Sequence, residues 1–361
     1  MRSRSLFRYY GADLQGTVSA FEADVCRELG VGYAVAVSSG TAALRCALAA
    51  LGIGPGHRVV VPAFTFIATV NAVVACGATP VFAEVDDTLG LDPARVPDAD
   101  AAIVVHIENV VCDMDAMTID MPIIEDAAQA FGATYWGNAA GSFGELGCFS
   151  LQLEKNITAG EGGVVTTNDE RLYLRASRYQ DQGGQFVTSY ASTRGDELSE
   201  PFAGENLRMG ELAGAVAGVQ LGRLPEILDA LRTNKRRILD AVGAIDGLTP
   251  RRVPDAAGDG SSSCMWFLPD KATARRFAKG MLAEGLPCAQ MYRGEPVYWN
   301  PAVLDRRTAL GTGDWVAEKG MFPATEALVA RNVIVPVGVR YTEADCDAIA
   351  TAVTKVAKEI L

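Results

Sequence analysis

The amino-acid sequence predicts an α/β fold in which helices cover both faces of a mostly parallel sheet. Short apolar runs alternate along the chain with longer segments that have the spacing of amphipathic helices. Glycine and proline stand at many of the junctions, where they end one element before the next begins. This alternation is typical of parallel sheets whose connecting helices pack back on the sheet.

The first half of the chain shows the alternation most clearly. Helical spacing from Val18 to Leu29 ends at Gly30, and Gly40 opens an Ala- and Leu-rich helix that runs to Leu51. Another helix is expected at 65–76, and strands are expected at 33–37, 58–61, 80–85, 102–106, 123–125 and 164–167.

The second half predicts a smaller α/β unit. A long helical stretch, 224–242, leads to a segment rich in proline, glycine and serine, 250–263, whose composition indicates a seam between domains. A chain of 361 residues is also long for one hydrophobic core. We therefore expect a large domain at 1–240, with an N-terminal helical segment, and a small C-terminal domain at 241–361. The elements expected after the seam are a strand at 265–268 and helices at 272–284 and 343–361.

Composition excludes several classes of protein. Apolar residues make up 49% and charged residues 21%, which is ordinary for a globular protein. The net charge of −12 argues against a nucleic-acid binder, because phosphate contacts need clustered lysine and arginine. The N-terminus lacks the apolar stretch of a secretion signal, and no segment reaches the roughly 18 apolar residues of a membrane span. We expect a cytoplasmic protein.

Cysteine and histidine usage predicts neither disulfides nor a metal site. The eight cysteines are scattered without a CxxC pair, which in a chain of this length favours reduced thiols. Two histidines are too few for a histidine-rich metal centre.

Lys155 is the most informative single residue. It follows the mostly apolar run Ser150-Leu-Gln-Leu-Glu, and a Gly-Glu-Gly-Gly turn begins at Gly160. Most lysines are solvated surface residues, and that interpretation stands for Lys155 taken alone. A lysine in a desolvated cleft instead loses proton affinity and becomes a nucleophile.

Other residues supply parts of the same site. Asp126 ends a buried apolar run, where an unpaired carboxylate is costly, so it either caps the next helix or faces a bound cation. Gln129, three residues on, shares its helical face. Gly40, Thr41 and Ala42 lie at a strand-to-helix junction, where free N–H groups either receive a cap or bind an anion.

Ser150 and Phe66 complete the set. The hydroxyl of Ser150 is available to a phosphate, and Phe66 is either a core aromatic or a platform for a flat ring. An amine that forms a Schiff base, a carboxylate for a pyridinium nitrogen and a hydroxyl for a phosphate are the protein groups that pyridoxal 5'-phosphate needs. A nicotinamide oxidoreductase is disfavoured, because its glycine fingerprint is missing and Lys155 would have no role.

These motifs together resemble a known family. The segments that carry the resemblance are Val37-Ser-Ser-Gly-Thr-Ala-Ala-Leu44, Pro62-Ala-Phe-Thr-Phe66, Ile124-Glu-Asp-Ala-Ala-Gln129, Cys148-Phe-Ser-Leu-Gln-Leu-Glu-Lys155 and Gly204-Glu-Asn-Leu-Arg-Met209. They are similar to the DegT/DnrJ/EryC1/StrS family, the sugar aminotransferases of fold type I. The resemblance runs from about Tyr10 to the C-terminus, and it implies a large cofactor-binding domain with a mostly parallel sheet plus a smaller C-terminal α/β domain.

The resemblance implies roles for the catalytic residues. Lys155 would hold pyridoxal phosphate as a Schiff base and shuttle the proton at the substrate carbon. Asp126 would pair with the pyridine nitrogen, Gln129 with the ring hydroxyl, and Phe66 would stack on the ring. Asn206 would reach the phosphate of a neighbouring subunit, so that a homodimer shares its active sites.

The phosphate site is implied in the same way. Ser150, Thr41 and the backbone of Gly40 and Ala42 would hold the phosphate. A ping-pong cycle follows, in which glutamate or glutamine gives its amino group and a keto or aldehyde sugar receives it. The alternatives are a sugar dehydratase, in which a histidine replaces the lysine, and a regulatory homologue without turnover; the intact Lys155, Asp126, Gln129 and Ser150 disfavour both.

Three segments depart from the family pattern near the expected cleft. Segment 106–113 lacks a glycine, 117–122 is short and suggests a trimmed helix, and 180–184 has Asp-Gln-Gly where relatives place a His-Gly pair. With 296–300, they suggest an acceptor other than a nucleotide-linked hexose, such as the terminal aldehyde of an eight-carbon ulosonate. Arg208 and Arg293 either grip an anionic substrate or form structural ion pairs, and the second interpretation is favoured.

Overall fold

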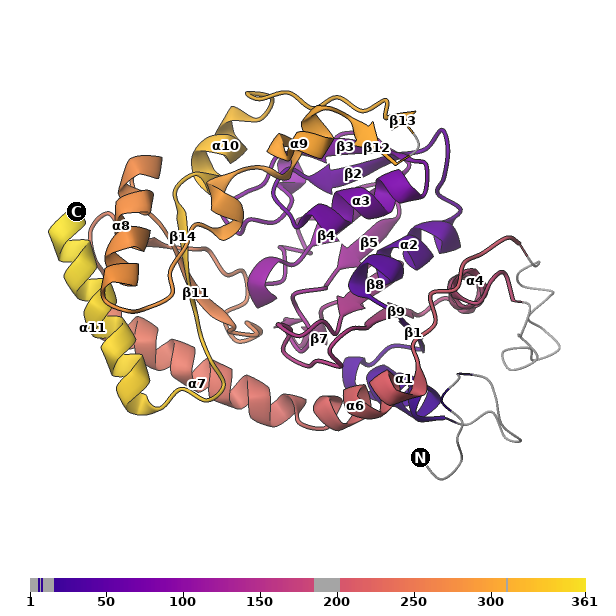
Figure 1. Ribbon diagram of the computed structural model, residues 1–361, viewed down its shortest axis with the longest axis horizontal. Helices are drawn as coiled ribbons and strands as arrows, with labels where there is room; N and C mark the ends of the chain where they lie inside the picture. Colours follow the sequence, from indigo (N-terminus) through magenta and orange to yellow (C-terminus); the bar gives the residue numbers. More distant parts are fainter. Residues whose placement is uncertain (1–5, 7, 9–15, 185–201, 310) are drawn as a thin grey trace.

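The computed structural model describes residues 6, 8, 16–184, 202–309 and 311–361, and its centre is a seven-stranded sheet of order β1-β9-β8-β5-β4-β2-β3 (Figure 1). The strands are β1 (Tyr33–Val37), β2 (Arg58–Pro62), β3 (Thr79–Ala83), β4 (Ala101–Val105), β5 (Ile123–Asp126), β8 (Leu146–Ser150) and β9 (Gly163–Thr167). Only β9 runs against its neighbours β1 and β8. The predicted mostly parallel α/β sheet is confirmed.

Helices cover the sheet on both faces because neighbouring strand residues point in opposite directions. Val35 and Val37 pack in a core with α2 (Gly40–Leu51) and α3 (Ile67–Ala75), whereas Ala34 and Ala36 pack in another core with α1 (Thr17–Leu29). The remaining helices of the large-sheet half are α4 (Glu170–Gln180) and α6 (Glu211–Leu221).

Local sequence explains where these helices begin and end. The Ser39 hydroxyl caps α2 by accepting from the Ala42 N–H at 3.1 Å, and Gly52 ends the helix with φ 80°. The helix expected at 65–76 begins only at Ile67, since Phe66 keeps an extended backbone as its N-cap. Segment 117–122 holds no helix, so the trimmed helix expected there is absent and Met117 instead packs in a core under the sheet.

A second, antiparallel sheet of β10 (Thr249–Pro250), β11 (Ser263–Phe267) and β14 (Asn332–Pro336) lies beside the first. The long helix α7 (Leu224–Val242) joins the two halves, and α8 (Lys271–Ala283) and α11 (Glu343–Ile360) cover the small sheet (Figure 1). Segment 250–263, the expected seam, therefore begins in the small sheet and ends where β11 starts.

Part of the C-terminal half returns to the large sheet. The Val297 N–H donates to the Ala63 carbonyl at 2.8 Å, and the Val85 N–H donates to the Thr325 hydroxyl at 2.9 Å. This returning segment contains two 3₁₀ turns (Met291–Gly294 and Val297–Trp299), the short helices α9 (Pro301–Leu304) and α10 (Pro323–Val329), and a small ribbon of β12 (Arg307–Thr308) and β13 (Gly311–Thr312). The predicted division at residue 240 thus does not follow the packing at every point.

Two general expectations can be compared with the structure directly. All eight cysteines are unpaired, as the absence of a CxxC pair suggests. No helix in the described ranges is long and apolar enough to cross a membrane.

Candidate active site

A cavity of about 600 Å³ opens at the edge of the large sheet where the parallel strands end. Loops that follow β1, β2, β5 and β8 line it, which is where ligands bind in open α/β sheets. Seven of the residues predicted from the sequence line this cavity: Gly40, Thr41, Phe66, Asp126, Gln129, Ser150 and Lys155.

Lys155 lies in the loop between β8 and β9, beyond the end of the strand. Its N–H donates to the Gln152 carbonyl at 3.0 Å, which fixes the backbone of this turn. The side chain is partly buried, and it lines both this cavity and a second one beside it. Within the described ranges its amine has neither an ion pair nor a hydrogen bond, so it is available to a ligand.

Asp126 ends β5 and presents a buried carboxylate to the cavity. The Thr69 hydroxyl donates to its Oδ2 at 2.8 Å, and the Ala128 N–H donates to its Oδ1 at 3.2 Å. Burial raises the pKa of Asp126, while these two hydrogen bonds and the charges of His106 and Lys155 pull it down. No cation of the described chain forms an ion pair with Asp126, so a cationic group of a ligand would offset the cost of its burial.

The neighbouring acid, Glu125, has a purely structural environment. It is fully buried, and its two oxygens accept from the N–H groups of Gly141, Phe143 and Gly144 and from His106 Nε2 at 2.9 Å. Because successive strand residues face opposite sides of a sheet, Glu125 points away from the cavity that Asp126 faces. The pair of acids in the sequence thus divides into one structural and one accessible carboxylate.

The start of α2 forms a narrow cradle against the end of β8. A Cβ atom added at Gly40 would lie 2.8 Å from the Ser150 Cβ, so only glycine allows this approach. Ser150 is 8% exposed, and its hydroxyl accepts from the Gln152 N–H at 3.3 Å. Ala42, also predicted, does not line the cavity, and its N–H donates to the Ser39 hydroxyl. The cradle therefore offers Gly40, Thr41 and Ser150 at a helix N-terminus, where an anion is stabilised.

Phe66 and Gln129 face each other across Tyr292. Phe66 is 54% exposed for a large aromatic, and its ring centre lies 6.2 Å from that of Tyr292. Gln129 Nε2 donates to the Tyr292 hydroxyl at 2.8 Å, and its Oε1 accepts from the Glu108 N–H at 3.0 Å. An exposed aromatic beside a tethered amide is suited to holding a flat, polar ring.

The remaining predicted residues lie outside the cavities. Asn206 is exposed and pairs by a backbone bridge with Asp181, so its role at a partner's phosphate stays a prediction. Arg208 forms an ion pair with Asp181 at 2.6 Å, in agreement with the structural interpretation. Arg293 is exposed and lines neither cavity.

The three departures from the family pattern differ in their position. Only 106–113 contributes to the cavities, through Glu108 and Asn109; segments 117–122, 180–184 and 296–300 line neither. Glu108 and Asn109 have φ of 49° and 60°, so the turn that lacks a glycine is made by two residues with left-handed backbones. Of the three segments expected near the cleft, only 106–113 thus lines a cavity, and a role for 117–122 and 180–184 in the choice of acceptor stays a prediction.

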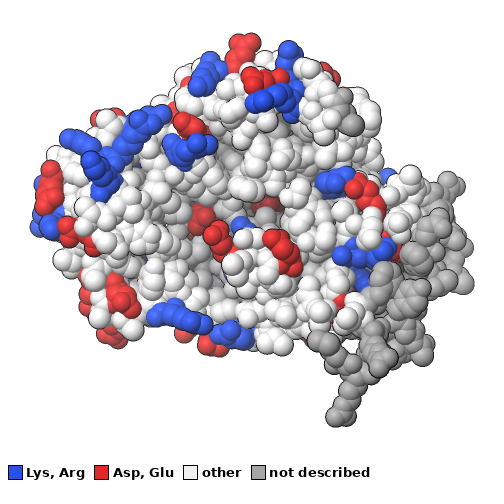
Figure 2. Space-filling model, viewed as in Figure 1, with Lys and Arg blue, Asp and Glu red and all other residues white. Residues whose placement is uncertain are grey.

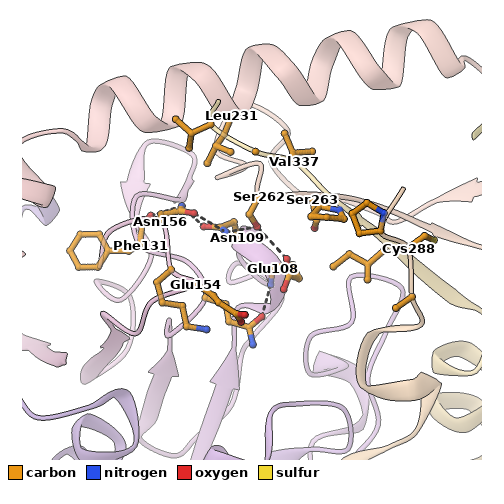
Figure 3. Close-up of a pocket in the computed structure, with 18 of the residues that line it drawn as sticks. Glu108, Asn109, Phe131, Glu154, Asn156, Leu231, Ser262, Ser263, Cys288 and Val337 are labelled. Carbon is orange, nitrogen blue, oxygen red and sulfur yellow. Dashed lines mark hydrogen bonds between the residues drawn. The ribbon is translucent and has the colours of Figure 1, made fainter. Parts of the chain in front are cut away.

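A second cavity of about 950 Å³ lies between the large and small sheets and shares Lys155 with the first. Its polar wall is a chain of hydrogen bonds (Figure 3): Asn156 Nδ2 donates to Asn109 Oδ1 at 2.7 Å, and Asn109 Nδ2 donates to the Ser262 hydroxyl at 2.7 Å. Leu231 of α7 and Val337 after β14 form an apolar wall on the opposite side. The space is large enough for a substrate next to the cofactor site.

Sequence reasoning missed three residues of this region. Thr69 bonds Asp126, Tyr292 bonds Gln129, and Glu108 lines both cavities. The missing glycine at 106–113 was a signal for Glu108, whereas Tyr292 has no local signal because only the tertiary fold brings it near Phe66 and Gln129.

The family model that matches the chain covers residues 13–354 and is described as the DegT/DnrJ/EryC1/StrS aminotransferase family. The chain therefore belongs to this family. A solved structure of an aminotransferase from Psychrobacter cryohalolentis aligns with a TM-score of 0.83 and 28% identity, over 99% of this chain and 94% of that one.

Curated relatives are similar over a shorter stretch. GDP-perosamine synthase of Caulobacter vibrioides is 41% identical over 58% of this chain and 56% of its own length. L-glutamine:2-deoxy-scyllo-inosose aminotransferase of Micromonospora echinospora is 37% identical over 61% of this chain and 56% of its own length. The matched part of the chain thus spans little more than half the length of each relative.

Proposed function

We propose that the chain is a pyridoxal-phosphate-dependent aminotransferase that moves an amino group from glutamate or glutamine to a sugar-like ketone or aldehyde. The observation that carries the proposal is the convergence of Lys155, Asp126 and the Gly40–Ser150 cradle on one cavity. Family membership and the names of the two relatives support the same activity.

The residues of the cavity fit this cofactor. The cradle at the start of α2 suits the phosphate, because a helix N-terminus and a serine hydroxyl meet where a Cβ would intrude. Asp126 is a buried carboxylate without a cationic partner in the described chain, which suits a protonated ring nitrogen. Phe66 would contact the face of the ring, and Gln129 or Tyr292 would contact its hydroxyl.

Each protein group has a defined task in the reaction. When bound, pyridoxal phosphate supplies the electron sink that makes the bond to hydrogen at the amino-bearing carbon easier to break. The Lys155 amine takes that proton from the donor carbon and later delivers a proton to the acceptor carbon. Asp126 keeps a negative charge fixed opposite the ring nitrogen, and this charge costs no reorganisation during the reaction.

The overall exchange is balanced without a further oxidant. The donor CH–NH₂ becomes C=O while the acceptor C=O becomes CH–NH₂, in two successive half-reactions at the same lysine. Asn206 is proposed to complete the phosphate site of a neighbouring copy in a homodimer, since it is exposed in one chain. The acceptor classes to be compared are the terminal aldehyde of an eight-carbon ulosonate, a nucleotide-linked keto-sugar and an uncharged polyol ketone.

The test is the visible spectrum of the purified protein with added pyridoxal phosphate, before and after glutamine or glutamate is supplied. We expect a bound-cofactor band that an amino donor bleaches. Lys155→Ala is expected to lose the band and to lower turnover by roughly 10³-fold or more, whereas Lys319→Ala, an exposed lysine outside both cavities, keeps both. A protein that binds no cofactor would overturn the proposal.

The same measurement separates the rival functions. A band that no amino donor changes, with no amine formed from any acceptor, would favour a regulatory homologue. Loss of a hydroxyl from a keto-sugar without formation of an amino-sugar would favour the dehydratase, which Lys155 in place of a histidine disfavours.

A further inference from the structure

The charges that line the two cavities are almost all negative. Asp126, Glu108, Glu154 and Glu161 line one or both cavities, and Lys155 is the one cationic side chain that lines either within the described ranges. Figure 2 shows acidic side chains gathered around the hollow in the middle of this face, with a small basic area between them. Lys155 is committed to the cofactor, so among the described residues that line the two cavities no other cation is left for an anionic end of a substrate.

Glu108 is the acid placed to act on a substrate. It lines both cavities, and its backbone is fixed in the left-handed region by the hydrogen bond from its N–H to Gln129 Oε1. The Ser262 hydroxyl donates to its Oε2 at 3.2 Å, while Oε1 has no hydrogen bond within the described ranges (Figure 3). Gln129 therefore holds the backbone of Glu108 and Ser262 holds its carboxylate, which keeps one oxygen for a ligand.

The other polar groups of this wall are already satisfied. The amides of Asn109 and Asn156 bond each other, and Asn109 also bonds Ser262. Asn156 further donates to the Phe131 carbonyl at 3.0 Å. The group of this wall that is still available to a ligand is therefore mainly the Glu108 carboxylate. A carboxylate accepts hydrogen bonds from hydroxyl and amide N–H groups, and it repels other carboxylates and phosphates.

Both substrates of a two-step amino transfer occupy the same space beside Lys155 in turn. The side-chain end of the donor and the ring of the acceptor therefore both meet this wall. We propose that Glu108 makes the second cavity, between the two sheets, selective for uncharged substrate ends. The favoured donor is glutamine, with its side-chain carboxamide, rather than glutamate, with its side-chain carboxylate. The favoured acceptor is a polyhydroxylated ketone without carboxylate or phosphate. The inference rests on the proposed aminotransferase function.

The donor step gives the first test. The rate at which each donor bleaches the cofactor band is measured in single turnover, and the holoenzyme is expected to prefer glutamine over glutamate by about tenfold or more, the effect of one like charge at close range near a protein surface. Glu108→Gln removes the negative charge and keeps the side-chain length, so the preference is expected to fall about tenfold through faster reaction with glutamate.

Two control variants separate charge from structure. Glu318→Gln removes one negative charge from an exposed site outside both cavities and is expected to leave the preference unchanged. Ser262→Ala removes the hydroxyl that holds Glu108 but no charge, so the preference for glutamine is expected to persist. If Glu108→Gln fails to fold, Glu108→Asp in the same assay keeps the charge and is expected to keep the preference.

The acceptor step is tested by mixing the donor-reduced enzyme with neutral and anionic carbonyl compounds. A cyclic polyol ketone is expected to restore the cofactor band, whereas an eight-carbon ulosonate aldehyde and a nucleotide-linked keto-sugar are expected to do so at least tenfold more slowly. Equal rates with glutamine and glutamate, or a preference that Glu108→Gln leaves intact, would overturn the role of Glu108. Because either donor would still bleach the band, the aminotransferase proposal would survive that result; a band that neither donor bleaches would remove both.

Discussion

The two cavities that meet at Lys155 are built in different ways. The cavity that contains Asp126 and the Gly40–Ser150 cradle, the cofactor cavity, is formed mainly by loops at one edge of the large sheet, and residues 289–292 of the C-terminal half complete its lining. The second cavity, between the two sheets, is lined by residues from both halves of the chain that are far apart in the sequence, among them Glu108, Leu231, Ser262 and Val337. The first cavity depends mainly on local chain geometry, and the second depends on how the two halves of the chain are fixed to each other.

Segment 250–263 links the two halves through hydrogen bonds to the large-sheet half. The buried Arg251 donates to the Thr88 carbonyl and to the Ile107 carbonyl, each at 2.8 Å, and the Gly260 N–H donates to the Asn109 carbonyl at 3.0 Å. Burial lowers the pKa of Arg251 to about 10. This segment therefore places Ser262 beside Glu108, and the position of the Glu108 carboxylate in the second cavity depends on it.

The largest expected effect concerns the cofactor cavity. Asp126→Asn removes the charge opposite the ring nitrogen and is expected to lower turnover by roughly 10²- to 10³-fold. Because burial raises the pKa of Asp126, its ionised form destabilises the folded protein at neutral pH, so the cofactor-free variant is expected to unfold at the same or a higher temperature than the unmodified chain.

The pH dependence of that difference gives an independent check. When folding raises the pKa of a carboxyl group, the free energy of unfolding falls as the pH rises from the group's ordinary pKa of about 4 through its pKa in the folded protein. The stability advantage of Asp126→Asn is therefore expected at pH 7 and should vanish as the pH falls toward 4. A variant less stable at both pH values would show that the two hydrogen bonds of Asp126 outweigh its burial.

A second prediction breaks the connection between the halves. Arg251→Met leaves two buried carbonyls without donors and is expected to reduce the free energy of unfolding by roughly 2 to 4 kcal/mol, measured by urea denaturation. The neighbouring Arg252→Met is the matched control, since Arg252 is 40% exposed and bonds Asp86 and Asp87 at the surface. Its expected loss is at most about 1 kcal/mol. Equal losses would contradict the role assigned to Arg251.

The smallest effect concerns the cradle. Gly40→Ala brings a Cβ to 2.8 Å from the Ser150 Cβ and is expected to weaken cofactor binding about tenfold, measured by titration of the apoprotein with pyridoxal phosphate. Gly218→Ala on α6 meets open space and is expected to stabilise the helix by roughly 0.5 to 1 kcal/mol without changing that affinity. Unchanged binding by Gly40→Ala would place the phosphate elsewhere.

The elements that the sequence predicted best are those with local causes. The bounds of α1, α2 and α7 follow helical spacing and the glycines that end these helices closely. The approach of Gly40 to Ser150 was not predicted, because it joins two segments far apart in the sequence. The position of Asp126 at a strand end was also readable, because strand alternation alone separates it from Glu125. What failed were the details of loops, such as the trimmed helix at 117–122, where side-chain packing replaces regular structure.

The sequence by itself determined the class of fold, the family and the line of residues from Gly40 to Lys155, since each rests on short-range patterns of polarity, glycine and chain direction. Only the tertiary structure decided that Tyr292 would hold Gln129, that Arg251 would fix the seam, and that Glu108 and Ser262 would meet across two sheets. These contacts join residues roughly 150 positions apart. Burial and hydrogen bonding select them when the whole chain is packed, and no local pattern encodes them.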